Sequence, residues 1–337
     1  MNAVAPLALQ EAHEPPEVRG AGRDDVSMLV ADAHAGSLVH ARFCDLPSFL
    51  REGDLLVVNN SATLPAALPA ELAGHPIELR LSTPEAGGTW VVELRAGDGS
   101  RLGPPPPGSR VALPGGAHAD LLAQVAGSAR LSIARLELGA PLETYLRRHG
   151  RPIRYGYVPS EWPLDAYQTV FALEPGSAEL PSAGRPFTTR LVTELVSRGV
   201  LIAPITLHTG VSSPELDEPP SPELYRIPEA TAGVVNAVRG RGGRVIAVGT
   251  TVVRALETTA QLDGTVAPGE GRTNVVVTPR TGVRAVDGLL TGWHEPRSTH
   301  LQMLEALAGD ELVERCYREA AARGYRLHEF GDLHLII

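Results

Sequence analysis

The stretch RVIAVGTTVVRALET, Arg244 to Thr258, places an apolar strand, a glycine turn and a hydroxyl-rich helix start in one short segment. The run Val245 to Val248 predicts a buried interior strand, and Gly249 supplies the turn after it. Thr250 or Thr251 is expected to cap the helix that follows. In α/β proteins such junctions are common ligand sites, because the free N–H groups at a helix start attract anions.

The composition describes an acidic chain with a large potential core. Its 337 residues are 43% hydrophobic, which suffices for two domains, and the formal net charge of −9 argues against a broadly basic nucleic-acid-binding surface. All 30 basic residues are arginines, and arginine suits paired hydrogen bonds to phosphates and carboxylates. The absence of lysine excludes a P-loop after the opening strand.

Other segments exclude further classes of protein. The two cysteines, Cys44 and Cys316, provide no disulfide framework, and no Cys/His cluster has the spacing of a zinc site. The N-terminus lacks a signal-peptide pattern, and no apolar run approaches the length that spans a membrane. The sequence therefore predicts a cytoplasmic protein without a membrane partner.

The order of predicted elements indicates the fold class. From about residue 71 to 140, short alternating stretches separated by Gly and Pro turns predict a small all-β domain. On either side strands and helices alternate. Strands are expected at 55–58, 200–206 and 274–278, a hairpin turn near 35–36, and helices near 188–198, 228–239, 298–307 and 311–323. We therefore expect an α/β fold, in which a large α/β domain of residues 1–70 and 141–337 carries an inserted small β-barrel-like domain of residues 71–140.

Four polar blocks stand where such a sheet would bring them to one edge. They are Tyr167–Thr169 with Pro181–Gly184, Thr206–Gly210, the opening GTT segment, and Thr291–Thr299. His208 follows an apolar strand, where a neutral imidazole can act as base or acid near pH 7; a purely structural histidine is the alternative. Trp293 can either stack on a purine or pack in the core.

Together these blocks resemble one family, the S-adenosylmethionine:tRNA ribosyltransferase-isomerases of queuosine biosynthesis. The similar segments run through nearly the whole chain: RGAGRDD, GDLLVVNN, YQTVFA with SAG and FT, ITLHTGV, RVIAVGTTVVRALET, DGLLTGWHEPRST, and GYR with FGD. The resemblance implies a large α/β domain with an inserted β-barrel-like domain. It also implies that the ribosyl group of S-adenosylmethionine moves to a 7-aminomethyl-7-deazaguanine at the tRNA wobble position and rearranges to epoxyqueuosine, as adenine and methionine leave.

That reaction requires a base near the acidified C5′ hydrogens, a proton donor for adenine and an anion site for the methionine carboxylate. On this resemblance His208 and Glu257 are the candidates for proton transfer, with His294 as a third catalytic, positioning group. Contacts to S-adenosylmethionine, a co-substrate, are assigned to Thr250, Thr251, Arg254, Tyr167, Gln168, Ser298 and Thr299. No metal is expected.

The chain also departs from the family. Ala62 and Ala67 stand where the family has basic residues, Arg185 and Pro186 replace a Leu–His pair, and Gly292 and Glu295 replace Asn and Leu. These changes leave three hypotheses: the family reaction on the tRNA anticodon region, an S-adenosylmethionine-consuming reaction on a small-molecule acceptor, and a non-catalytic protein that binds S-adenosylmethionine or RNA. The sequence does not determine the acceptor, the base or the oligomeric state.

Overall fold

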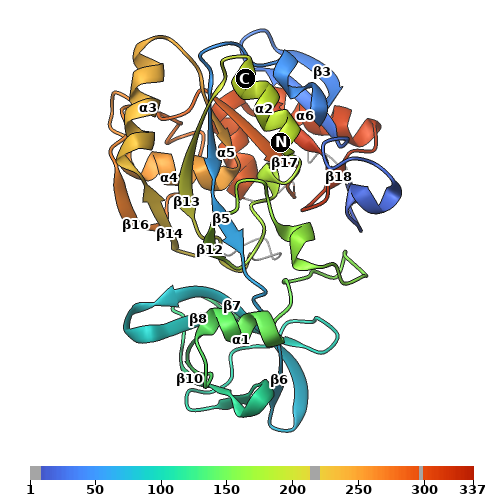
Figure 1. Cartoon of the computed structure of the whole chain (residues 1–337), viewed down its shortest axis with the longest axis vertical. Coiled ribbons are helices and arrows are strands. Elements are labelled where there is room, and N and C mark those ends of the chain that lie inside the picture. The colour runs from blue at the N-terminus through green and yellow to red at the C-terminus, as the bar shows by residue number, and fades with distance from the viewer. Residues whose placement is uncertain (1–8, 213–220, 296–298) are drawn as a thin grey trace.

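The computed structural model describes residues 9–212, 221–295 and 299–337, and it has two parts (Figure 1). In the upper, larger part, segments from both ends of the chain lie together, whereas the lower part is a β-barrel formed by residues in between. The expected arrangement, an α/β domain carrying an inserted barrel-like domain, is confirmed. Within the described ranges, no helix is long and apolar enough to cross a membrane.

The large part contains one sheet that, among the described residues, has nine strands. Their spatial order is β16 (Gly269–Thr273), β14 (Glu223–Ile227), β13 (Leu201–Leu207), β4 (Leu55–Asn59), β15 (Val245–Val248), β17 (Gly288–Gly292), β19 (Leu333–Ile336), β2 (Ser27–Asp32) and β3 (Ser37–Arg42). The four central strands β13, β4, β15 and β17 are parallel. β4, β15 and β17 are buried along their whole length, as is usual for parallel strands, whereas β13 exposes Leu201 and Pro204.

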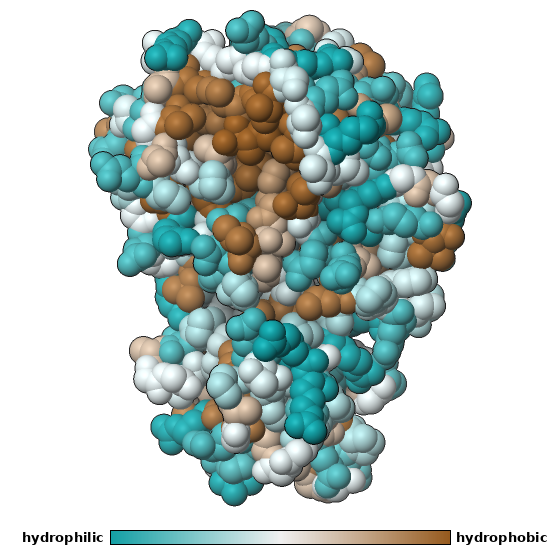
Figure 2. Space-filling model, viewed as in Figure 1, coloured by the Kyte–Doolittle hydropathy of each residue, from teal (hydrophilic) through white to brown (hydrophobic). Residues whose placement is uncertain are grey.

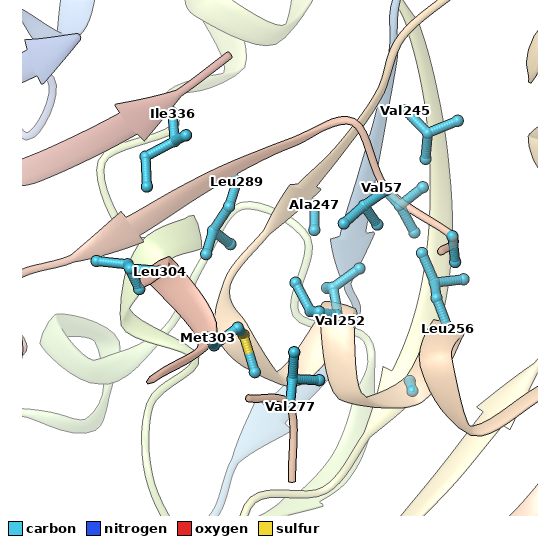
Figure 3. Packing of buried hydrophobic residues seen from close by; sticks show 14 of the residues in the cluster. Val57, Val245, Ala247, Val252, Leu256, Val277, Leu289, Met303, Leu304 and Ile336 are labelled. Atoms are coloured by element: carbon cyan, nitrogen blue, oxygen red, sulfur yellow. The ribbon is translucent and has the colours of Figure 1, made fainter. Parts of the chain in front are cut away.

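Helices cover both faces of this sheet. They are α2 (Thr189–Ser197), α3 (Glu229–Gly240), α4 (Thr250–Thr259), α5 (Thr299–Ala308) and α6 (Asp310–Ala322). Val252 and Leu256 of α4 pack against Val57 and Ala247 of the sheet, and Met303 of α5 lies in the same cluster (Figure 3). On the other face α2 packs through Leu191 and Leu195.

The barrel is closed by six strands in the order β10 (His118–Gln124), β11 (Leu131–Glu137), β8 (Thr89–Ala96), β7 (His75–Glu85), β6 (Ala67–Leu72) and β9 (Arg110–Ala112). Helix α1 (Leu142–His149) packs Tyr145 and Leu146 into the barrel core. The structure thus begins the barrel at Ala67, ahead of the expected boundary at 71, and adds α1 to it. The visible face of the barrel is mostly hydrophilic or neutral, whereas exposed hydrophobic residues gather on the larger part (Figure 2).

One expected strand of the large part is wrong, and two short strand pairs were not expected. Residues 274–278 form no strand; the strand in this region is β16, five residues earlier, where Gly269–Thr273 pairs with β14. The segment has the apolar pattern of a strand, but this pattern serves packing: Val277 is buried in the core against α4 and α5 (Figure 3). The short pairs β5 (Ser61–Thr63) with β12 (Glu174–Ser177), and β1 (Gln10–Glu11) with β18 (Arg326–Leu327), were not anticipated.

Candidate functional site

The carboxyl ends of β4, β13, β15 and β17 meet at one edge of the sheet, because these strands are parallel neighbours. Asn59, His208, Gly249 and Trp293 stand at these ends. The chain also enters the barrel from this edge, through β5 (Figure 1). Clefts at the carboxyl edge of an open α/β sheet are where such folds bind ligands, so this edge is the candidate active site.

His208 is held by two buried hydroxyl groups. Its Nδ1 lies 2.7 Å from Oγ of Ser61, and that oxygen lies 2.6 Å from Oγ of Ser177. Both serines are fully buried. A Cβ atom on Gly176 would overlap the imidazole ring, so this glycine leaves the space that the ring occupies.

The surroundings of His208 favour its neutral form. Burial lowers the pKa of His208, the charge of Glu174 acts in the opposite direction, and the charge of Arg226 lowers the pKa further. Glu174 and Arg226 bind each other at 3.1 Å, which leaves little net charge beside the ring. The imidazole is therefore neutral at pH 7.

Helix α4 begins differently from the expectation. Its N-cap is Gly249, at φ 100°, and neither Thr250 nor Thr251 caps the helix through its side chain, because α4 already starts at Thr250. The N–H of Gly249 donates to the carbonyl of Leu290 at 2.8 Å, which closes the turn directly above the sheet. The first N–H groups of α4 consequently point out of the helix at the sheet edge, where an anion is favoured.

Arg254 lies one turn further into α4 and binds protein groups. Its guanidinium pairs with the carboxylate of Glu223 and donates to the carbonyls of Val275 (3.2 Å) and Thr273 (3.4 Å). The other oxygen of Glu223 accepts from the N–H of Gly210 at 2.9 Å. Arg254 thus supports the loop after His208.

Glu257 is not brought to the site. One of its oxygens accepts from the N–H groups of Arg284 (2.7 Å) and Ala285 (2.8 Å). Helix α4 runs away from the strand ends, and seven residues of helix separate Glu257 from Thr250 by about 10 Å along the axis. Arg254 and Glu257 share a helix face, as expected, but each binds a different part of the chain.

His294 belongs to a pair of stacked imidazoles. Its ring lies 4.2 Å from that of His300 in α5, and its Nε2 lies 2.9 Å from Oγ1 of Thr291. Burial lowers the pKa of both histidines, to about 4 for His300. Trp293, beside them, is buried against His334, Tyr317 and Tyr325, so of the two expectations for this residue, packing in the core is confirmed.

Tyr167 and Gln168 bind other parts of the protein and hold the segments that carry the site. Tyr167 is buried against Phe330, and burial raises the pKa of its hydroxyl to about 12. The side-chain amide of Gln168 donates to the carbonyl of Thr63 at 2.8 Å and accepts from its N–H at 3.0 Å. Gln168 thus fixes β5, which carries Ser61. Thr299 is the first residue of α5, and Ser298 lies outside the described residues.

Two departures from the family acquire structural roles. Arg185 is buried, donates to both oxygens of Glu17 at 3.0 and 3.1 Å and stacks over Phe330. Ala67 is 1% exposed in the barrel core, directly across from Arg80 on β7, so a cation already occupies this part of the barrel.

Sequence reasoning missed four residues of the site: Ser61, Ser177, Glu223 and His300. Each was present in the chain without a motif to mark it, and each acquires its role from a partner that is distant in sequence or on another element. The feature of the sequence that lay closest to Ser61 was Asn59, the last residue of β4. The side-chain amide of Asn59 holds β13 to β4 through the backbone of Leu207, at 2.8 and 3.0 Å. Among the residues described, no group of three or more His, Cys, Asp or Glu could hold a metal ion.

Comparisons with known proteins agree along the whole chain. Residues 8–336 match the family model described as queuosine biosynthesis protein. The S-adenosylmethionine:tRNA ribosyltransferase-isomerase of Moorella thermoacetica is 39% identical, with 97% of this chain and 96% of that protein covered; the one of Geobacter sulfurreducens is 36% identical, with 96% and 97% covered. The crystal structure of the S-adenosylmethionine tRNA ribosyltransferase from Thermotoga maritima is 29% identical, covers 98% of both chains and superposes with a TM-score of 0.55.

Proposed function

The chain belongs to the S-adenosylmethionine:tRNA ribosyltransferase-isomerase family, and from this premise we propose that it transfers and isomerises the ribosyl group of S-adenosylmethionine. The acceptor is the 7-aminomethyl-7-deazaguanine at the wobble position of tRNA, and the product is epoxyqueuosine. Adenine and methionine are released. As a tRNA-modifying enzyme, it works in the cytoplasm.

The observation that carries this proposal is the coverage of the similarity. The relatives match 96–97% of this chain, barrel included, so no part of the family architecture is replaced. The departures at Ala67 and Arg185 concern buried positions with local partners. They therefore give no specific support to a small-molecule acceptor.

The proposed site uses the sheet edge. The N-terminus of α4, at Thr250 and Thr251, offers N–H groups and hydroxyls to the methionine carboxylate. His208 lies at the end of β13, at the same edge but across β4 from β15, and contacts the reacting part of the substrate, while His294 and Thr299 border the edge from β17 and α5. Arg254 and Glu257 are not included as substrate contacts, because their side chains bind Glu223 and the backbone at Arg284.

The test is turnover by the purified protein. It is incubated with S-adenosylmethionine and with tRNA that carries the deazaguanine precursor, and adenine, methionine and modified nucleoside are followed by mass spectrometry. We expect adenine release that depends on this tRNA, and epoxyqueuosine in the digested tRNA.

Two comparisons make the result specific. His208→Ala should lose about 100-fold or more in kcat/KM, whereas His34→Asn, in the exposed β2–β3 turn, should match the unmodified protein. Turnover that requires a small acceptor instead of tRNA would establish the second hypothesis. No adenine under any condition, despite binding of S-adenosylmethionine, would reject both enzymatic ones.

A further inference from the structure

The hydrogen bonds around His208 form a chain in which only one direction pairs every buried hydroxyl hydrogen. A backbone N–H can only donate, and the N–H of Thr209 donates to Oγ of Ser177 at 3.1 Å. Besides Thr209, the hydroxyl of Ser177 has one hydrogen-bond partner among the described residues, Oγ of Ser61 at 2.6 Å, so the hydrogen of Ser177 is paired only when it is donated to Ser61. The hydroxyl of Ser61 in turn donates to Nδ1 of His208, at 2.7 Å.

This direction decides which ring nitrogen carries the proton. If Nδ1 accepts from Ser61, the neutral imidazole must carry its hydrogen on Nε2. An imidazolium would reverse the chain, because Nδ1–H would donate to Ser61, Ser61 to Ser177, and Ser177 would have no described acceptor. Reversal would thus leave the buried O–H group of Ser177 without an acceptor, which is costly.

The ring itself has little freedom to rearrange. Gly176 lies against its Nδ1 edge, so closely that a methyl group there would overlap the ring. The backbone N–H of His208 donates to the carbonyl of Leu224 at 2.9 Å, which fixes the main chain that carries the ring. The Nε2 atom, in contrast, has no hydrogen-bond partner among the described residues and is not one of the buried, unpaired nitrogens.

We propose that the chain Thr209–Ser177–Ser61 holds His208 as the neutral Nε2–H tautomer, so that His208 donates a hydrogen bond to the substrate and does not remove or supply a proton. Ser61 and Ser177 are then positioning residues that act through His208. This assigns His208 a narrower role than the proton transfer expected from the sequence. A neutral imidazole that stabilises charge through its N–H is an established form of catalytic group.

The tautomer can be measured without any turnover. Protein labelled with 15N in histidine is recorded by long-range proton–nitrogen NMR at pH 7, and the His208 signals are assigned by their loss in His208→Gln. We expect a bare Nδ1 and a protonated Nε2. A protonated Nδ1, in either the neutral or the charged ring, would overturn the proposal.

Variants test the positioning role. Ser61→Ala should give a mixture of tautomers and lower kcat/KM for S-adenosylmethionine about tenfold, since one hydrogen bond is lost. Ser61→Thr keeps the hydroxyl and should restore both signals and rate. An unchanged tautomer in folded Ser61→Ala would refute the role of the serines.

The role in turnover rests on the proposed function, but the tautomer does not. If adenine is never released while the Nε2–H signal is present, the proposed function fails and the hydrogen-bond chain stands. If adenine is released while Nδ1 of His208 carries the proton, the proposed function stands and this inference is wrong.

Discussion

Buried histidines are a prominent feature at the scale of single residues. Burial lowers the pKa of His300 and His328 to about 4 and of His334 to about 3. His334 is fully buried, stacks on Trp293 at 4.6 Å, and neither of its ring nitrogens has a hydrogen-bond partner among the described residues. Such a ring is tolerated only while it stays neutral.

His334 therefore makes stability fall in acid. Its folded-state pKa of about 3 lies below the value of about 6.5 in the unfolded chain, so below pH 6.5 the unfolded state gains a proton that the folded state does not. This stabilisation is lost as the pH falls from 6.5 toward 3. Between pH 7 and pH 5 the free energy of unfolding should fall both in the unmodified protein and in His334→Phe. We expect the fall to be about 2 kcal/mol smaller in His334→Phe, because the variant lacks this histidine.

The measurement is chemical denaturation at each pH. Comparing slopes removes any constant cost of fitting the phenyl ring. The matched control is His34→Asn, whose exposed side chain should leave the pH dependence unaltered. Equal slopes for His334→Phe and the unmodified protein would contradict the assignment.

At the scale of elements, the start of α4 depends on a glycine. Gly249 has φ 100° and ψ 149°, a region that side-chain-bearing residues rarely adopt. A Cβ atom there would find ordinary contacts, 3.4 Å to Thr251 and 3.6 Å to Ala183, so the cost of a side chain lies in the backbone. The turn must be this sharp because its N–H closes onto β17 and its helix starts at once.

Gly249→Ala is expected to lower the free energy of unfolding by about 2 kcal/mol and to weaken S-adenosylmethionine binding, since the helix start shifts. Gly240→Ala is the matched control: the residue ends α3, its φ is not positive, and nothing lies within 4 Å of the added methyl group. This control should be neutral or stabilising by about 0.5 kcal/mol. Denaturation and calorimetric titration measure both effects; equal stabilities would refute the backbone argument.

At the scale of the whole molecule, the barrel is tied to the loop that follows His208. The N–H of Val211 donates to Oγ of Ser82 at 3.0 Å, and the carbonyl of Val211 accepts from Arg130 at 3.1 Å. Arg272 of β16 adds an ion pair with Glu85 at 3.1 Å. The barrel is thus a support for the sheet edge as well as a separate core.

Ser82→Ala should loosen this connection. It leaves the buried N–H of Val211 without its acceptor, which costs about 1–3 kcal/mol. A cost of about 1.4 kcal/mol changes an equilibrium constant tenfold. We expect amide hydrogen exchange at residues 208–211 to accelerate about tenfold, while exchange in β6 and β7 stays constant. Ser109→Ala, on the exposed rim of the barrel, should change neither, and unchanged exchange in Ser82→Ala would show that the loop is held by other contacts.

Much of the fold was predictable from local pattern. The apolar runs at 55–58, 200–206 and 245–248 became strands because continuous hydrophobic runs suit a sheet that is covered on both faces. Residues 274–278 were expected to form a strand for the same reason, because they are an apolar run. The expectation was wrong because strand propensity reflects burial more than pairing. The polar sequence at 269–273 pairs instead, because β14 offers it an edge.

The sequence by itself determined the layers of the molecule, the inserted barrel, and the placement of His208 and the α4 start at one edge. The layers and the barrel follow from periodicity, which is a local property, and the shared edge follows from the rule that parallel strands of an α/β sheet end on the same side. Only the tertiary structure decided the partners: Ser61 and Ser177 lie 116 residues apart, Arg254 meets Glu223, and Glu257 is carried away along α4. Hydrogen bonds depend on distances of a few ångströms between side chains, and packing of distant segments sets those distances.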